Sequence, residues 1–310
     1  MNLPTQAKHE VVLTLAVALN SHALPSRGFF TNSSLLGSGV ITLGNDIQYE
    51  EGSATYLEVR SGGDITLDLA GFTIDRGLSN INLMDLSDDY DDNGTPSIIL
   101  NQGTLTITDS SDDKSGAIIG GLSRFGYGAI YNANGGQLFI EGGTIRDNKI
   151  IDSDDPYDGN GAGAIYNAGE LFIKGGSIVN NQGSSYGAIL NTEVGSFHLS
   201  GNPSFSNNTC VVNGNTINED VYLKDFRQMI TLDDTLGESV QLAVGVILDD
   251  QVSVVITNSL PNNGRISNFV SSHEGFAVGP SVQGEAMLGV PHNVTIDSGI
   301  TNGNVSANKE

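Results

Sequence analysis

The most regular pattern in this sequence is an apolar and polar motif that occurs three times, at residues 128–148, 163–181 and 187–208. The third copy follows the second more closely than the second follows the first. The extra length is mostly an acidic insertion at residues 150–162. A unit of roughly two dozen residues that tolerates insertions is typical of a solenoid.

Each copy contains three short strand-like pieces, and glycine or asparagine stands at each junction, where sharp turns need it. Within each piece the alternation directs one or two apolar side chains inward. The pieces are 129–131, 138–140 and 144–145, then 164–166, 171–173 and 177–178, then 188–190, 197–199 and 204–205. Three short strands per turn, stacked turn upon turn, predict an all-β fold, a right-handed parallel β-helix.

Looser versions of the pattern extend the predicted β-helix to residues 39–290. They lie upstream at 39–47, 62–75 and 103–121, and downstream at 219–225, 229–237 and 252–260. From about residue 259 to 289 the rhythm breaks, so this part is predicted to cover the C-terminal end. Residues 1–38 form a separate N-terminal segment, and residues 291–310 are predicted to be a linker or the start of a truncated following β-module.

An apolar segment at residues 8–26 has two interpretations. It forms either an N-terminal capping helix that plugs the open end of the β-structure, or a signal peptide with Ser21, His22 and Ala23 at its cleavage site. The helix is favoured because Glu10 abuts the apolar run and Lys8 is the only basic side chain before it.

Asparagines recur at equivalent turn positions in the three copies. They are Asn132, Asn167 and Asn191 after the first piece, and Asn148, Asn181 and Asn208 after the third. Stacked amides hydrogen-bond along such a row, and asparagine also suits a left-handed turn. The structural ladder is favoured over the alternative, a polar ligand-binding strip.

Tyr131 and Tyr166 occupy equivalent positions in the first two copies. They alternate with Ile130 and Ile165, so we expect the isoleucines to face inward and the tyrosines outward. An outward tyrosine pair is a candidate platform for stacking against sugars. These two residues are the predicted ligand-binding residues.

The charge of the chain is strongly negative, with 13 Lys and Arg against 36 Asp and Glu and a net charge of −23. Such a surface repels nucleic acids and anionic membranes. No apolar run is long enough for membrane insertion. Cys210 is the only cysteine, which excludes an intrachain disulfide and a cysteine-based zinc cluster.

One acidic segment matches the first half of a calcium-binding loop. Asp89, Asp91 and Asn93 are spaced as its oxygen ligands, and Gly94 follows them. Leu100 stands where the bidentate glutamate belongs. A Ca²⁺ site and a solvated acidic loop therefore both remain open, as they do for the second oxygen-rich segment at residues 152–161.

Several segments together resemble a known family. "ITLDLAGFTIDRG" at 65–77 resembles a "TLDLNGHTI" segment of pectate-lyase-like β-helix proteins on bacterial surfaces, especially of gut Firmicutes. "TLTITDSS" at 104–111, the tandem "GAIYN" copies and "VQGEAMLG" at 282–289 follow in the order of that family. The resemblance covers about residues 39–289 and implies an adhesin-like module of a large secreted or cell-surface protein.

Three functions are consistent with these patterns. The favoured one is binding without catalysis to a surface glycan or a host or microbial surface protein, by one module of a larger chain. The second is a polysaccharide-degrading lyase or glycoside hydrolase. It is disfavoured because the Gly-His-Gly and Arg-Ile-Lys motifs of galacturonases are absent, and because Arg124, Arg146, Lys149 and Lys174 form no cluster. The third is a passive structural stalk.

Overall fold

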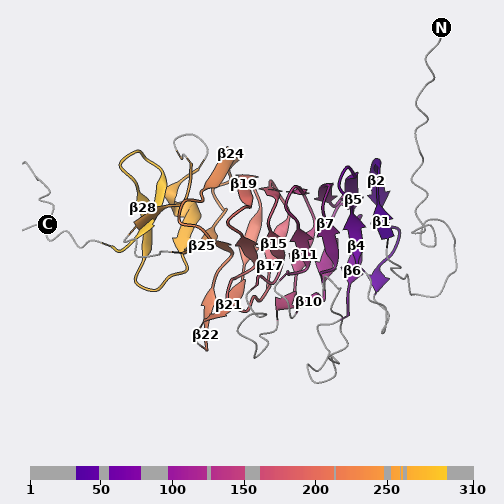
Figure 1. The fold of residues 1–310 in the computed structure, drawn as a ribbon, viewed down its shortest axis with the longest axis horizontal. Helices are drawn as coiled ribbons and strands as arrows, with labels where there is room; N and C mark the ends of the chain where they lie inside the picture. The colour runs from indigo at the N-terminus through magenta and orange to yellow at the C-terminus, as the bar shows by residue number, and fades with distance from the viewer. Residues whose placement is uncertain are drawn as a thin grey trace, which may run out of the picture.

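The structure is a computed structural model that describes residues 33–48, 56–77, 97–123, 127–150, 161–212, 214–247, 253–258, 260 and 264–291. Figure 1 shows its strands stacked in chain order along the long axis, from β1 at one end to β28 near the other. The predicted capping helix at 8–26 lies outside the described residues, as does nearly all of the predicted segment 291–310.

Three parallel sheets form most of the molecule. The first has nine strands: β1 (Ser33–Leu35), β4 (Leu57–Val59), β7 (Ile99–Asn101), β11 (Ile130–Asn132), β15 (Ile165–Asn167), β18 (Ile189–Asn191), β23 (Val221–Leu223), β25 (Leu242–Val246) and β27 (Phe269–Ser271). The second has seven: β2 (Ser38–Thr42), β5 (Asp64–Asp68), β8 (Thr104–Thr108), β12 (Gln137–Ile140), β16 (Glu170–Ile173), β19 (Ser196–Gly201) and β24 (Ile230–Leu236). The third has six: β3 (Ile47–Gln48), β6 (Thr73–Asp75), β9 (Ala117–Ile119), β13 (Thr144–Arg146), β17 (Ser177–Val179) and β20 (Ser204–Ser206).

From β1 to β20 the strands of these sheets occur in rotation, one from each sheet in turn. Two short pairs lie between the third sheet and the next strand of the first: parallel β10 (Leu122–Ser123) with β14 (Lys149–Ile150), and the antiparallel hairpin β21 (Thr209–Val212) and β22 (Asn215–Asn218). The described residues contain no α-helix. This all-β arrangement of long parallel sheets is compatible with a parallel β-helix.

The core follows from the alternation in each strand. In β11 and β15, Ile130 and Ile165 are fully buried and paired in register, while the neighbouring tyrosines face outward and are half-buried. The other two sheets contribute inward residues in the same way, among them Leu138 and Ile145. Each such buried aliphatic side chain contributes about 1.5–3 kcal/mol, so the interior of the rod supplies most of the stabilisation.

The predicted asparagine ladders are confirmed. Asn132 Nδ2 donates to Asn167 Oδ1 at 2.7 Å, and Asn167 Nδ2 donates to Asn191 Oδ1 at 2.6 Å. The row begins one turn earlier than expected, because Asn101 donates to Asn132 in the same direction. These amides also bond backbone oxygens at the start of the second sheet, such as Glu170 O and Ser196 O. The row therefore fixes the corner between the first and second sheets.

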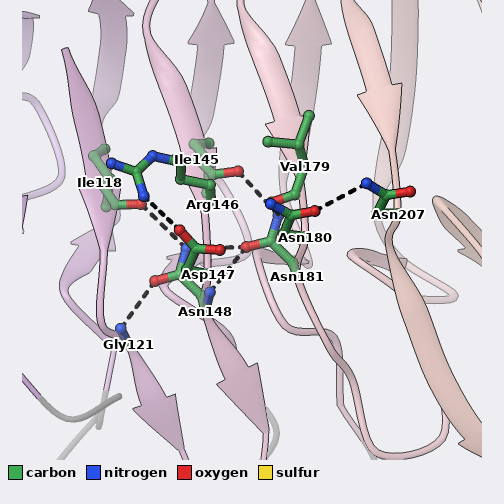
Figure 2. A network of polar contacts seen from close by, with 10 residues as sticks. All are labelled: Ile118, Gly121, Ile145, Arg146, Asp147, Asn148, Val179, Asn180, Asn181 and Asn207. Carbon is green, nitrogen blue, oxygen red and sulfur yellow. Dashed lines mark hydrogen bonds and ion pairs between the residues drawn. The ribbon is translucent and has the colours of Figure 1, made fainter. Parts of the chain in front are cut away.

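Figure 2 shows part of the second ladder, with Gly121, Asn148 and Asn181, at the end of the third sheet. Gly121 N donates to Asn148, Asn148 donates to Asn181 at 3.0 Å, and Asn181 donates to Asn208 at 3.1 Å. The row ends on an acid, since Asn208 Nδ2 donates to Asp220 Oδ1 at 2.8 Å.

The position of the left-handed turn was predicted wrongly by one residue. Positive φ occurs at Asp147, Asn180 and Asn207, directly before the ladder residues Asn148, Asn181 and Asn208. The two neighbouring rows of residues differ in solvent exposure. The exposed residue of each turn adopts the left-handed conformation, and the buried residue after it forms the hydrogen bonds of the ladder. Within the exposed row, Asn207 Nδ2 bonds Asn180 Oδ1 at 3.1 Å, as Figure 2 shows.

The rotation of strands changes towards the C-terminus. Residues 252–260 were predicted to add another turn, but β26 (Ser253–Val255) pairs antiparallel with β29 (Ala286–Gly289), which also pairs antiparallel with β28 (Ala277–Pro280). Two parallel contacts continue here: Thr257 forms an isolated parallel bridge with Ile230 of β24, and β27 pairs with β25 just after a 3₁₀ turn at Ile266–Asn268. The expected break in rhythm is therefore present, but it begins before β26, since the third sheet has no strand after β20 among the described residues.

Candidate ligand-binding surface

Five tyrosines gather on the outer face of the nine-stranded sheet, and we call them the tyrosine strip. They are Tyr127, Tyr131, Tyr166, Tyr186 and Tyr222. Tyr131, Tyr166 and Tyr222 occupy the same ladder position on β11, β15 and β23, while Tyr127 and Tyr186 come from the segments that lead into β11 and β18.

The rings at the N-terminal end of the strip touch one another mostly edge to face. Tyr131 and Tyr166 have centroids 5.4 Å apart and planes at 88°. Tyr127 stacks on Tyr131 at 4.7 Å and meets Tyr166 at 71°. The predicted pairing of Tyr131 with Tyr166 on the outer face is therefore present, but as an edge-to-face contact rather than a flat stack.

The third copy of the motif has leucine where the first two have tyrosine. Leu190 pairs in register with Tyr166 on one side and Tyr222 on the other, and it is 1% exposed. Tyr186, from the preceding segment, packs on Tyr222 with centroids 4.6 Å apart. An aromatic surface therefore continues past the leucine to β23.

The hydroxyl groups of the strip are available to a ligand. No hydrogen bond joins any of the five to another residue in the described part of the chain, and none of their oxygens is buried there without a partner. Burial of the rings raises the pKa of Tyr166 to about 12 and also raises the pKa values of Tyr131, Tyr186 and Tyr222. At neutral pH the phenols therefore stay protonated, and each can donate and accept a hydrogen bond.

An ion pair lies beside the strip. Lys224 Nζ is 3.6 Å from Glu193 Oε1, and both side chains are partly exposed. The negative charge of Glu193 raises the pKa values of both Tyr166 and Tyr186, after the larger effect of burial, so this carboxylate lies near both halves of the strip. The pair adds an acceptor and a donor next to the rings.

A buried carboxyl group lies under the C-terminal end of the strip. Glu219 is 2% exposed and accepts hydrogen bonds from Gly187 N at 2.9 Å and Ser272 Oγ at 2.7 Å. Gly245, paired with Tyr222, leaves room for it, because a Cβ there would lie 2.0 Å from Glu219 Oε2. Burial raises the pKa of Glu219 to about 7.

A second aromatic group lies on the outer face of the seven-stranded sheet, and we call it the aromatic stack. Phe139 and Phe172 are almost parallel, with centroids 4.5 Å apart and planes at 8°. His198 continues the stack at 4.4 Å and its Nδ1 lies 3.0 Å from Asp233 Oδ1. Lys174 Nζ lies 5.2 Å from the centroid of Phe139 and also pairs with Glu141.

The predicted calcium ligands Asp89, Asp91 and Asn93 lie outside the described residues, as do Arg124, Tyr157 and most of the acidic segment 152–161. Within the described ranges, no three His, Cys, Asp or Glu side chains are grouped as metal ligands. Of the basic residues considered for catalysis, Arg146 pairs with Asp147 and Lys174 with Glu141. Among the described residues there is no helix with the length and hydropathy of a membrane span.

Two residues of this surface were missed at the level of sequence. Tyr222 could have been found by aligning Val221-Tyr222-Leu223 with the Ile-Tyr-Asn pieces of the earlier copies, since its segment had already been assigned to the repeat. Glu219 carries no comparable signal, because its burial depends on Gly187, Gly245 and Ser272 from three separate segments.

Comparisons with known proteins add no relative, since no family model, curated protein or solved structure matches the chain.

Proposed function

We propose that this chain is a right-handed parallel β-helix module of the pectate-lyase-like type that binds a surface glycan on its tyrosine strip and does not cleave it. It belongs to a secreted or cell-surface bacterial protein made of several modules. The three parallel sheets and the order of the sequence motifs support this assignment of type.

The observation that carries the proposal is the tyrosine strip itself. Its rings are half-buried, so they are held in place before a ligand arrives and cost little entropy on binding. Their free hydroxyl groups can bond sugar hydroxyls while the ring surfaces pack on sugar C–H groups. A surface with both properties fits a sugar better than it fits a purely apolar ligand.

A glycan array probed with the whole chain tests this function, with and without Ca²⁺ and with the spots checked for cleavage. We expect retention on specific glycans without cleavage. The double variant Tyr131→Ala/Tyr166→Ala should lose retention, and the matched variant Phe139→Ala/Phe172→Ala, which removes two rings from the aromatic stack, should keep it.

Two other outcomes reject the proposal, and a third extends it. Cleaved spots would support the polysaccharide-degrading enzyme. An array without retention would leave a protein-binding surface or a passive stalk. Dependence of retention on Ca²⁺ would assign a role to the predicted ligands Asp89, Asp91 and Asn93, which no described contact tests.

A further inference from the structure

The chemistry beside the tyrosine strip indicates the class of glycan that it takes. We infer that the strip binds an uncharged glycan chain that lies lengthwise along the rod, across successive strands. This inference rests on the proposed function, and it goes further by naming the charge and the direction of the ligand.

The direction follows from the register of the strands. Tyr131, Tyr166 and Tyr222 share one ladder position, with Leu190 between the last two. From β11 to β23 there are three strand steps, so the strip is roughly 14 Å long at about 4.8 Å per step. A surface of this length, one ladder position wide, matches a short oligosaccharide better than a single sugar.

The flank of the strip supplies hydrogen-bonding groups at a fixed place. Glu193 follows β18, and Lys224 follows β23 in the neighbouring turn, where its backbone N donates to Asn191 O at 3.0 Å. Their side chains pair at 3.6 Å, at the level of the last two strands of the strip, β18 and β23. A carboxylate and an ammonium group side by side can accept from one sugar hydroxyl and donate to the next.

The charges favour an uncharged ligand over an acidic one. Among the described residues, the cationic side chains of Lys224 and Arg227 lie at this corner, and both are already paired, Lys224 with Glu193 and Arg227 with Asp225. The whole chain has a net charge of −23. A uronate or sialate would bring its carboxylate to a strongly negative chain without gaining an unpaired cation at this corner, whereas a neutral sugar meets no such repulsion.

The charges also argue against a strongly cationic ligand as the main partner. Glu193 is balanced by Lys224, and the Glu219 carboxyl is enclosed by Gly187, Cys210 and Ser272. The strip therefore presents polar groups without a free negative charge at the rings. Hydroxyl and acetamido groups fit this surface.

The test compares neutral and acidic oligosaccharides that share one backbone and differ only in a hydroxymethyl or a carboxyl group. We expect the native chain to bind the neutral member at least about tenfold more tightly at low salt, with the gap shrinking as salt screens the repulsion. Within the neutral series, affinity should rise with chain length and then reach a plateau when the ligand covers the strip.

A charge variant sharpens the test. Glu193→Lys should bring the affinity for the acidic member up towards that for the neutral one. Glu238→Lys makes the same change in net charge, at an exposed ion pair with Arg265 that follows β24, and should leave the preference as it is. A change of preference in both variants would show an effect of net charge alone and would overturn the role of Glu193.

The failures of the two proposals can be told apart. If glycans bind and Tyr166→Ala abolishes binding, but acidic members bind as well as neutral ones or better, this inference is wrong and the proposed function stands. If affinity does not depend on length, the lengthwise direction is wrong. If no glycan of either class binds, the proposed function and the inference fail together.

Discussion

The tyrosine strip and the aromatic stack have the same origin in the repeat but present different surfaces. Each is built around side chains at one outward ladder position in copies of one motif, and Tyr127 and Tyr186 join the strip from the segments before β11 and β18. In the stack, Phe172 has Phe139 on one face and His198 on the other, so its ring faces are covered and its edges remain. In the strip, Tyr131 and Tyr166 meet at 88°, and their hydroxyl groups have no partner among the described residues.

This comparison teaches that register brings rings together, while ring angle and substituents decide what the surface can do. In a flat stack the ring faces pack against one another, and this packing contributes to the stability of the fold. An edge-to-face row with free hydroxyl groups keeps hydrogen-bonding capacity that only a ligand or water can use. We therefore assign stability to the aromatic stack and binding to the tyrosine strip.

The largest expected effect is on stability, from a change in the asparagine ladder at the corner between the two sheets that carry these surfaces. Asn167 lies at the corner between β15 and β16, and its amide bonds Asn132, Asn191 and Ser196 O. Asn167→Ala leaves buried groups without partners and should lower the free energy of unfolding by about 3 kcal/mol or more. Denaturant titration measures this.

The control for that variant is Asn207→Gly, in the exposed row, where glycine keeps the left-handed turn. It should cost less than about 0.5 kcal/mol. Equal losses in the two variants would mean that the buried ladder contributes no more than an exposed hydrogen bond.

The next effect is a dependence of stability on pH that arises under the tyrosine strip. Burial raises the pKa of Glu219, under the strip, from 4.5 to about 7. The folded chain then keeps a proton that the unfolded chain releases, so the linked stability is complete below pH 4.5 and is lost as the pH rises to about 7. Glu219→Gln should remove this loss, which amounts to about 3 kcal/mol at 1.36 kcal/mol per pKa unit.

Unfolding titrations of both proteins between pH 4 and pH 8 measure the Glu219 effect. The variant should gain stability over the native chain progressively as the pH rises. A constant difference across this range would show that folding does not raise the pKa of Glu219, contrary to its enclosed position.

A smaller effect is expected from the aromatic stack. Phe172→Ala removes a ring with partners on both faces and should cost about 2 kcal/mol of stability, since stacked pairs add roughly 0.5–1.5 kcal/mol to the burial of area. Glycan retention should not change. A loss of retention without a loss of stability would reverse the assignment of the two surfaces.

The smallest effect tests the hydroxyl groups. Tyr166→Phe keeps the ring and removes an oxygen that has no partner among the described residues, so stability should not change. Glycan affinity should fall several-fold, in keeping with about 1 kcal/mol for one hydrogen bond. The converse variant Phe172→Tyr should leave affinity unchanged. Isothermal titration with the array's best glycan gives both values.

Much of the fold could be predicted because each strand repeats one local pattern. The alternation of Ile130 with Tyr131 predicted which side chains face inward and which face outward. The recurrence of asparagine at equivalent turn positions predicted the ladder of Asn132, Asn167 and Asn191. Thr257, in the segment 252–260, bridges Ile230 in parallel, as the predicted turn requires. Apolar alternation looks the same in parallel and antiparallel strands, so it did not show that β26 pairs antiparallel. Its partner, β29, is distant in sequence.

The binding surface was predictable only in part. Tyr131 and Tyr166 follow from the repeat, but Tyr186 joins the strip from a segment outside the strands, at the point where the repeat has Leu190. The angle between two rings depends on neighbours such as Tyr127, and the burial of Glu219 depends on three distant segments. Such tertiary effects leave no periodic signal in a single sequence.

Tyrosine fluorescence provides the most direct measurement, because the chain has nine tyrosines and no tryptophan. The emission is followed while a neutral oligosaccharide retained on the array is titrated into the native chain and the two double variants. A saturable change in the native chain and in Phe139→Ala/Phe172→Ala, but none in Tyr131→Ala/Tyr166→Ala, is the predicted result. Loss of the response in the phenylalanine variant, with the tyrosine variant still responding, would contradict the assignment of binding to the tyrosine strip.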